Sequence, residues 1–469
     1  MTKSQHRPAP QSDLPNRPTA DARAAALGVL ERLDSRPATL DSILENEAAM
    51  IDALPRRDRA LFNQLVYGVL RWRLRLDAVI SAHASRPLKK IAPNLRNILR
   101  LGLFQIRFLD RIPASAAVNT TVALAKTHRA SKAAGFVNAV LRSALREPGR
   151  DGLPDADADP VGHLSVSQSM PRWLVARWID RLGPDEAALL CESVNTIPPT
   201  ILRCNGLKNN LAELMAALEP DAERVEPIKA VPGALQLIRP RRAIHRMQAF
   251  ADGRFSVQDG AAQLISLLLD PKPGETVLDA CAGLGGKTTH LAQLMENQGH
   301  VVALDHVPAK LVRLEKEAGR MRLAIIETRR TDLNRPIDPS DFPRFDRILL
   351  DAPCSGLGVL RRNPDAKWSS FKKDIAGFAR RQVRFLEHLA PLVKKQGTLV
   401  FADCSMEPEE NESVVKQFLK KHPNFAISAN KAITEKTVLP FMGADGFFRT
   451  APHTHHMDGF FAARLTRMC

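Results

Sequence analysis

The chain has 469 residues with 44% hydrophobic and 5% aromatic content, and its formal net charge is +16. One hydrophobic core does not extend to this length, so we expect two or three domains. Residues 1–20 carry four prolines and lack the apolar core of a signal peptide, which predicts a disordered tail. No apolar run approaches the ~20 residues that span a bilayer. These features predict a cytoplasmic protein that does not interact with a membrane.

Two further bulk properties narrow the function. The six cysteines show neither a C-x-x-C pair nor a histidine at zinc-ligand spacing, so we expect no metal site and no disulfide framework. Residues 51–150 contain 19 Lys and Arg against 5 Asp and Glu, a net charge of +14, whereas the rest is nearly balanced. A basic domain beside a near-neutral one is typical of nucleic-acid binding, because phosphate neutralisation supplies affinity. A surface that merely promotes solubility is the alternative.

Residues 21–147 predict an all-helical domain. In Ala22–Leu33 the side chains of Ala25, Val29 and Leu33 recur every four residues, as on one face of an amphipathic helix. Four more segments show a similar pattern: Arg59–Leu70, Leu95–Phe108, Ala116–His128 and Ala133–Leu145. Prolines fall between these segments, where helices start or stop.

The next part of the chain changes in character. A stretch rich in Pro, Gly and Asp is typical of a linker, which we place at residues 148–169. Residues 170–255 alternate helical stretches, such as Pro171–Arg181 and Leu211–Glu219, with apolar runs such as Thr200–Cys204. This alternation predicts a small α+β subdomain.

Residues 256–469 alternate regularly between helices and strands. The predicted helices are Ala261–Leu269, Thr288–Glu296, Pro308–Arg320 and Ala376–Leu389. The predicted strands are Thr276–Asp279, His300–Asp305, Leu323–Ile326, Arg347–Leu350 and Thr398–Ala402. This order predicts an α/β domain with a doubly wound, mostly parallel sheet, in which ligands bind beyond the carboxyl ends of the strands. Four polar side chains should converge there: Asp279, Asp305, Asp351 and Cys404.

The glycine-rich turn after the first of these strands has three interpretations. A Walker A motif requires glycine where the chain has Cys281, although ILLD at 348–351 imitates a Walker B strand, so a nucleotide hydrolase stays open. A dinucleotide fingerprint fails at Thr288, where its third glycine should be. In a site for S-adenosylmethionine, Asp305 would accept hydrogen bonds from both ribose hydroxyls, and Asp332 would accept one from the adenine amino group.

Two cysteines lie just past predicted strands, Cys354 in DAPCSG and Cys404 in ADCSMEPEEN. A thiolate that adds to carbon 6 of cytosine makes carbon 5 nucleophilic enough to attack a methyl group, and a second thiol can act as general acid or base. Asp351 would bind the edge of the base and stabilise charge in the adduct. The alternative is that both cysteines are small buried hydrophobes.

The ordered motifs CAGLGGKTTH, LLDAPCSGLGVLRRNPDAKW and ADCSMEPEENESVV resemble those of the nucleolar-protein/Sun family of RNA cytosine-C5 methyltransferases. The helical domain, including LRNILRLGLFQI, resembles the RNA-binding domain of the NusB antitermination factor. This combination is similar to the 16S rRNA methyltransferases of the Sun/Fmu type. The resemblance covers almost everything from Ala22 onward.

The resemblance implies specific roles. Cys404 corresponds to the nucleophile, and Cys354 to the cysteine that helps to release the methylated RNA. Asp305, Asp332 and Asp351 correspond to acids of the methyl-donor site. The donor-binding loop corresponds to Cys281, Ala282, Gly283, Leu284, Gly285, Gly286 and Lys287.

The sequence departs from the family pattern at two places. Gly283 and Leu284 replace an Ala-Pro pair, and Asp403 replaces the usual threonine before the nucleophile. Because neighbouring side chains on a strand alternate sides, we expect Asp403 to face away from the thiol. Glu409, Glu410 and Asn411 keep the PEEN pattern of the family and are expected to open the following helix, where acids suit the helix dipole.

We therefore expect an enzyme that transfers a methyl group from S-adenosylmethionine to carbon 5 of a cytosine in 16S rRNA. Its partner would be small-subunit rRNA, and it would act as a monomer without an obligatory protein partner. The alternatives are the same reaction on tRNA and a non-catalytic NusB-like RNA-binding or antitermination factor.

Overall fold

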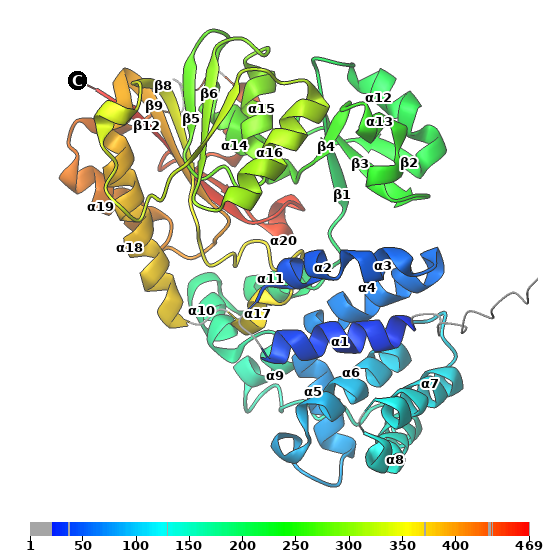
Figure 1. Cartoon of the computed structure of the whole chain (residues 1–469). Coiled ribbons are helices and arrows are strands. Elements are labelled where there is room, and N and C mark those ends of the chain that lie inside the picture. The colour runs from blue at the N-terminus through cyan, green and yellow to red at the C-terminus, as the bar shows by residue number, and fades with distance from the viewer. Residues whose placement is uncertain are drawn as a thin grey trace, which may run out of the picture. The chain divides into compact units, whose positions relative to one another are not determined.

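The computed structural model describes residues 21–35, 38–128, 130–369, 372–429, 433 and 435–468. The chain divides into two compact units, Met1–Pro154 and Asp155–Cys469 (Figure 1). The predicted tail at residues 1–20 lies outside the described residues. No helix in the described part of the chain combines the length and apolarity that a bilayer crossing requires.

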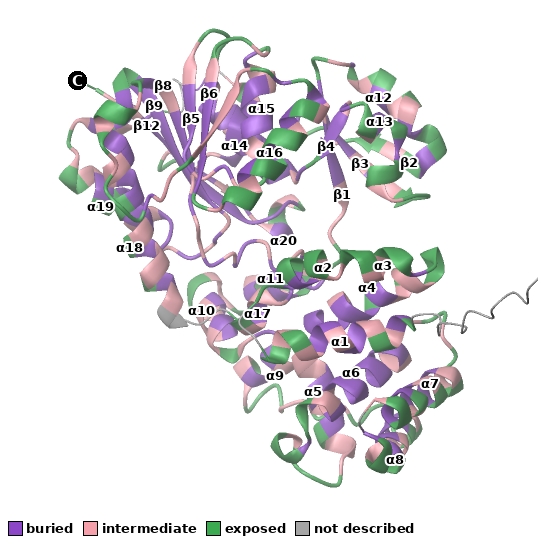
Figure 2. Cartoon of the chain, viewed as in Figure 1, coloured by how far each residue is buried: buried purple, intermediate pink, exposed green. Residues whose placement is uncertain are grey.

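The described part of the first unit is helical, as predicted. Each predicted helix is present within three residues of its expected bounds, because the apolar stripe of each faces a shared core. The helices are α1 (Ala22–Ser35), α2 (Leu40–Asn46), α3 (Ala48–Ala53), α4 (Arg56–Arg71), α5 (Arg73–His83), α6 (Pro93–Phe108), α7 (Ala114–Thr127) and α8 (Ala134–Arg146). Figure 2 shows their buried faces in purple, with exposed residues on the outer sides.

Two contacts explain how the helices of this unit pack. Gly68 on α4 lies against the ring of Phe104 on α6, where an added Cβ would be 1.9 Å from the ring. The buried Arg100 on α6 donates to both carboxylate oxygens of Asp77 on α5, each at 2.7 Å. Removing one partner of such a pair leaves an unpaired buried charge, which typically costs about 3–5 kcal/mol. These contacts fix α6 between its neighbours.

The second unit begins with three helices and a small sheet. The helices are α9 (Pro160–Ser167), α10 (Arg172–Leu182) and α11 (Pro184–Val194). The composition predicts a linker at 148–169, but this segment contains helix α9. Asp159 stabilises the start of α9 by accepting a hydrogen bond from the Gly162 amide at 2.9 Å. The small sheet is antiparallel in the order β2-β3-β1-β4 and packs with α12 and α13, the predicted α+β subdomain. Its elements are β1 (Thr200–Cys204), α12 (Leu211–Leu218), β2 (Ala222–Pro227), β3 (Ala234–Pro240), α13 (Gln248–Ala251) and β4 (Phe255–Val257).

A large sheet forms the rest of this unit. Its central strands are ordered β9-β8-β5-β6-β7 and are parallel, and an antiparallel β12 pairs with β9. Its strands are β5 (Thr276–Asp279), β6 (His300–Asp305), β7 (Ile326–Arg330), β8 (Phe345–Asp351), β9 (Val393–Asp403), β10 (Phe425–Ile427), β11 (Phe447–Thr450) and β12 (Phe460–Arg467). The chain runs from β5 outward to β7, then returns to the other side of β5 for β8 and β9. Ligands of such sheets bind where the order reverses, outside β5 and β8.

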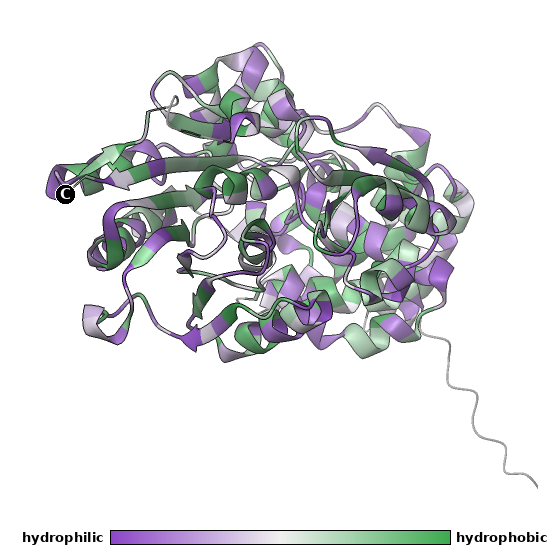
Figure 3. Cartoon of the chain, turned by 90° about the horizontal axis from the view of Figure 1, so that it is seen from above, coloured by the Kyte–Doolittle hydropathy of each residue, from purple (hydrophilic) through white to green (hydrophobic). Residues whose placement is uncertain are grey.

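Helices cover both faces of the large sheet. Apolar side chains of α14, α15 and α16 pack in one core layer, and those of α18 and α19 pack in the other. These helices are α14 (Gly260–Leu269), α15 (Gly286–Leu294), α16 (Pro308–Met321), α18 (Lys372–Leu389) and α19 (Glu412–Lys421); the short α17 (Ala366–Ser369) and α20 (Pro452–His455) lie in loops. Figure 3 shows hydrophobic residues in green alternating with hydrophilic residues in purple along the chain. The predicted doubly wound architecture is confirmed.

One predicted strand is wrong. The apolar run Leu323–Ile326 does not form it; the strand β7 begins at Ile326 and continues through polar residues to Arg330. Leu323 is a buried residue of the loop between α16 and β7, whereas β7 lies at the sheet edge and is only half-buried. A polar edge strand lacks the apolar signal on which the prediction depended.

Candidate active site

The carboxyl ends of the central strands bring together most of the residues singled out in the sequence. Asp279 ends β5, Asp305 ends β6 and Asp351 ends β8, while Cys404 immediately follows β9. Cys354 lies three residues after β8, in a segment whose backbone is fixed by the Ala352 amide bonded to β9 at 2.8 Å.

The two thiols are in direct contact. The sulfur atoms of Cys354 and Cys404 lie 3.2 Å apart, both side chains are half-buried, and neither forms a disulfide. Their hydrogen bond and burial raise the pKa of the Cys354 thiol well above its ordinary value. Cys354 therefore favours the protonated form and is placed to give a proton to Cys404.

A lysine of the glycine-rich loop joins this group. The Lys287 ammonium lies 2.6 Å from the Asp351 carboxylate and 5.1 Å from the centre of the Phe460 ring. Burial would lower the pKa of Lys287, but the charges of Asp351 and Cys404 and the hydrogen bond to Asp351 raise it. Lys287 therefore keeps its positive charge in the electrostatic neighbourhood of Asp351 and Cys404.

The glycine-rich loop is shaped for close approach of a ligand. Gly283 and Gly285 adopt left-handed backbone angles, φ of 58° and 86°, which favour glycine. A Cβ on Gly285 would lie 2.6 Å from the side chain of Leu314, so the loop cannot accommodate one there without movement. Helix α15 starts at Gly286, and Leu284 is exposed beside it. Gly283, which differs from the family pattern, therefore adopts the left-handed turn of this loop without the strain that a side chain would add.

Asp305 holds this loop from the second strand. One carboxylate oxygen accepts from the Gly283 amide at 3.1 Å, and the other accepts from the Val307 amide at 2.8 Å. The side chain is buried, with the Lys310 ammonium 3.6 Å away. Asp305 is thus fixed at the mouth of the loop, with a cation close by.

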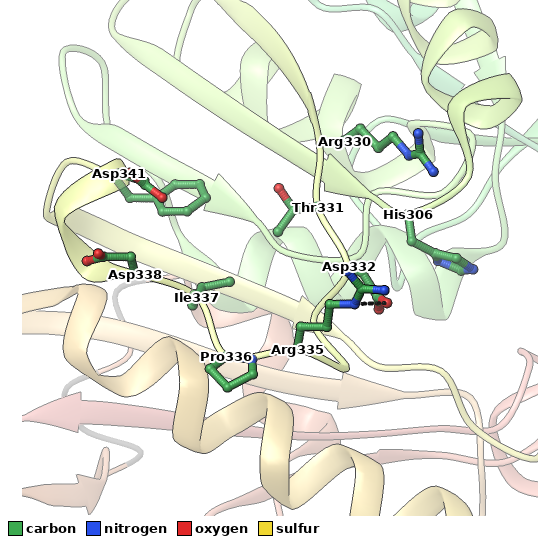
Figure 4. A pocket seen from close by; sticks show the side chains of 10 residues that line it. His306, Arg330, Thr331, Asp332, Arg335, Pro336, Ile337, Asp338 and Asp341 are labelled. Carbon is green, nitrogen blue, oxygen red and sulfur yellow. Dashed lines mark ion pairs between the residues drawn. The ribbon is translucent and has the colours of Figure 1, made fainter.

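Asp332 lies apart from the thiols, in a cavity of about 520 Å³ (Figure 4). Its carboxylate accepts from the backbone and side-chain amides of Asn334, and these bonds lower its pKa. The cavity is lined by His306, Arg330, Thr331, Asp332, Arg335, Pro336, Ile337, Asp338, Asp341 and Phe342. The cavity opens beside the loops that follow β6 and β7, and its volume is large enough for a planar polar group.

Asp279 is a site residue whose role the sequence left unassigned. Its carboxylate is 1% exposed; one oxygen accepts from the Thr288 hydroxyl at 2.7 Å, and the other has no hydrogen-bond partner in the described structure. Burial raises the pKa of Asp279 to about 6, opposed by the Thr288 bond. An unsatisfied buried oxygen at the base of the loop fits a ligand with a cationic donor, such as an α-ammonium group.

Asp279→Asn is expected to stabilise the ligand-free protein by about 3 kcal/mol at pH 8. The folded-state pKa of about 6 lies above the unfolded value, so the charged side chain destabilises the fold above pH 6. This destabilisation decreases as the pH falls toward 4, because the side chain is then protonated in both the folded and the unfolded protein. Denaturant unfolding from pH 4 to 8 should show the gain growing with pH, whereas the exposed Asp110→Asn should show none. A gain independent of pH would contradict the assignment.

A buried arginine from the small subdomain supports the same loop. Arg203 on β1 donates to the carbonyl oxygen of Gly286 at 2.6 Å, to the Thr289 hydroxyl at 2.9 Å and to Gln293 at 3.2 Å. It is 1% exposed, and its hydrogen-bond partners among the described residues are all neutral. The sequence offered no signal for this contact, because Arg203 lies far from the loop along the chain.

Two predictions for the residues around Cys404 concern the orientation of Asp403 and the start of the following helix. Ala402 and Cys404 pack against the same core layer, so the intervening Asp403 faces the other side, as alternation predicted. Its buried carboxylate accepts from the Ser405 amide at 2.8 Å, and burial raises its pKa well above the usual range. Helix α19 begins at Glu412 with Asn411 at its N-cap position, so Asn411 opens the helix as predicted, whereas Glu409 and Glu410 precede its first turn.

Comparison with known proteins places these features in a family. The model of the 16S rRNA methyltransferase RsmB/F family matches residues 266–466, that of the NusB family matches residues 20–146, and that of the RsmF/B-like ferredoxin-like domain matches residues 170–244. The chain is 38% identical to the probable ribosomal RNA small subunit methyltransferase B of Bacillus subtilis, over 95% of this chain and 98% of that protein. It is 35% identical to ribosomal RNA small subunit methyltransferase B of Vibrio cholerae, over 95% and 98%.

Solved structures agree with this assignment. The crystal structure of PH0851 superimposes with a TM-score of 0.78 at 28% identity, covering 95% of this chain and 98% of that one. A methyltransferase homologue from Pyrococcus horikoshii gives a TM-score of 0.56 at 25% identity, covering 66% and 99%. The family model and the curated relatives define an RNA methyltransferase. The chain belongs to the 16S rRNA methyltransferase RsmB/F family, with a NusB domain and a ferredoxin-like domain preceding the catalytic one.

Proposed function

We propose that the protein transfers a methyl group from S-adenosylmethionine to carbon 5 of a cytosine in 16S rRNA, through a covalent bond between Cys404 and carbon 6. The contact of 3.2 Å between the sulfurs of Cys354 and Cys404 carries this proposal. Two thiols in contact at the ligand edge of a methyltransferase sheet have little use for binding alone. They suit a reaction in which a sulfur must both bond to the ring and leave it.

The attack on the ring and the release from it use described side chains. The Cys404 thiolate bonds to carbon 6, and the electron pair of the 5,6 double bond moves toward carbon 5. That pair attacks the electrophilic methyl carbon of the donor, whose bond to the donor sulfur breaks, and the sulfur departs with the bonding electrons. A base then takes the carbon 5 proton, the 5,6 double bond re-forms, and the Cys404 sulfur leaves with the electrons of its bond to carbon 6. Cys354, protonated and hydrogen-bonded to Cys404, is placed to handle a proton in this release.

Lys287 and Asp351 complete the chemistry around the ring. The Lys287 ammonium stabilises the thiolate before attack and after release. The Asp351 carboxylate, 2.6 Å from Lys287, is placed to accept a hydrogen bond from the exocyclic amino group or a protonated ring nitrogen. A base must leave its helix to reach these groups, so an unpaired or flipped cytosine is the substrate.

The donor fits the remaining residues. We assign its ammonium group to the unsatisfied oxygen of Asp279, its ribose hydroxyls to Asp305 and its adenine to the cavity at Asp332. The loop from Cys281 to Lys287 encloses its amino-acid end, where the glycine backbone admits close contact.

We further propose that residues 21–147 bind rRNA, that residues 170–255 assist them, and that residues 256–469 catalyse. Lys89→Gln with Lys90→Gln tests the first part, since both side chains are exposed in the basic segment. Each lost phosphate contact should lower the slope of log affinity against log salt by about 0.7–0.9. Lys416→Gln with Lys420→Gln, exposed on α19, is the matched control. Equal slopes for the two double variants would place the RNA contact elsewhere.

Bisulfite sequencing of 16S rRNA from cells with and without the protein tests the function directly. One cytosine should resist conversion only when the protein is present, and purified protein with methyl-labelled S-adenosylmethionine should label the same position. Labelling of tRNA with none in 16S rRNA would overturn the substrate assignment.

A further inference from the structure

The carboxylate of Glu410 connects the two cysteine loops. It is fully buried, and one oxygen accepts from the Ser355 amide at 2.7 Å. The other oxygen accepts from the Ser355 hydroxyl at 2.5 Å and from the Ser405 hydroxyl at 2.6 Å. Ser355 follows Cys354 and Ser405 follows Cys404, so one side chain holds the residue next to each thiol.

The two serines also meet each other. Their hydroxyl oxygens lie 3.3 Å apart, nearly the same separation as that of the two sulfurs one residue earlier. Because Glu410 receives three hydrogen bonds from two loops that are 50 residues apart in sequence, it fixes the spacing of those loops. Hydrogen bonds to an ionised carboxylate are about twice as strong as neutral ones.

The neighbouring acids serve a different purpose. Glu407, also fully buried, accepts from Arg177 at 2.8 Å and from the Trp178 indole at 3.1 Å. Glu409 accepts from Arg177 at 2.8 Å. These two anchor the segment to α10, whereas Glu410 points to the thiol loops. Glu409 is therefore a suitable control for Glu410, because it is a neighbouring carboxylate that does not bind the thiol loops.

Electrostatics agrees with the geometry. Burial raises the pKa of Glu410, while the hydrogen bonds from Ser355 and Ser405 favour its charged form. Negative charge at Glu410 adds to the hydrogen bond with Cys404 and to burial in raising the pKa of Cys354. The carboxylate therefore holds Cys354 beside Cys404 and favours its protonated form. Loss of this charge alone would favour the Cys354 thiolate and speed its oxidation, so slower oxidation of a Glu410 variant reports a wider spacing of the thiols.

We propose that Glu410 is a positioning residue for the release step: it holds the proton-carrying thiol of Cys354 in contact with Cys404. This role deepens the proposed function and rests on it. Loss of Glu410 should allow the two loops to separate, so that Cys404 still attacks the base but Cys354 no longer assists its departure.

The thiol spacing can be measured without any RNA. Diamide oxidises two thiols to a disulfide only when the sulfurs approach to about 2.05 Å, which needs little movement from contact. Oxidation of Cys354 with Cys404, followed by mass spectrometry of the linked peptides, should be at least tenfold slower in Glu410→Ala and Glu410→Gln than in wild type. Glu409→Gln should match wild type. A general loss of stability would not slow oxidation selectively, and thermal unfolding of each variant checks for it.

The release step is measured with RNA and S-adenosylmethionine in a single turnover. Glu410→Gln, with both thiols intact, should accumulate a denaturant-resistant RNA adduct and resolve it at least tenfold more slowly than Glu409→Gln. If both Glu410 variants oxidise and release RNA at wild-type rates, the positioning role is wrong. If wild type forms no methylated cytosine and Cys354→Ala forms no adduct, the proposed function fails, and the diamide rates still decide whether Glu410 sets the spacing.

Discussion

Cys404→Ala is expected to lower methyl transfer by at least about a thousandfold while changing RNA affinity less than about twofold. Without a sulfur to bond to carbon 6, carbon 5 of cytosine stays a poor nucleophile, and Cys404 is the thiol in contact with Cys354. The side chain is small and only half-buried, so its loss leaves the fold intact. Incorporation of labelled methyl groups and RNA filter binding measure the two quantities.

Cys204→Ala is the matched control for this variant. Cys204 is also half-buried, but it lies on β1 and its sulfur contacts Asn209. Methyl transfer by this variant should equal that of wild type. Turnover retained by Cys404→Ala at the wild-type rate would end the covalent mechanism.

Cys354→Ala is expected to trap the protein on its RNA. The Cys404 thiolate still attacks, but the neighbouring thiol no longer handles the proton during release, so the bond from sulfur to carbon 6 persists. With cognate RNA and S-adenosylmethionine, most of the active protein should migrate as a slower band on a denaturing gel within one turnover. The fraction shifted, followed over time, gives the release rate.

The double variant Cys354→Ala with Cys404→Ala separates this adduct from any other cross-link. It should give no slower band under the same conditions. A band that persists in the double variant, or its absence from Cys354→Ala, would rule out the assigned pair of roles.

The strand-end residues show what the sequence can predict and why. Asp305, Asp351 and Cys404 follow apolar runs, and parallel strands bring their carboxyl ends to one edge, so the convergence follows from topology. The helices of the first unit follow in the same way from the spacing of apolar residues. Strand β7 escaped prediction because it is a polar edge strand.

Other features depend on contacts between segments distant in sequence. The PEEN motif identified Glu410 as an acid near a helix, but no local pattern says that its carboxylate accepts from Ser355, 55 residues away. Arg203 and Gly286 are 83 residues apart, and their hydrogen bond follows only from how the two sheets pack. The unsatisfied oxygen of Asp279 likewise becomes visible only when its surroundings are known.

The contact of Arg203 with the large domain has a thermodynamic consequence. A guanidinium that is 1% exposed satisfies its donors on Gly286, Thr289 and Gln293. Separating the ferredoxin-like domain from the large sheet would break all of these bonds at once. We therefore expect the two sheets to unfold in a single transition and not as independent modules.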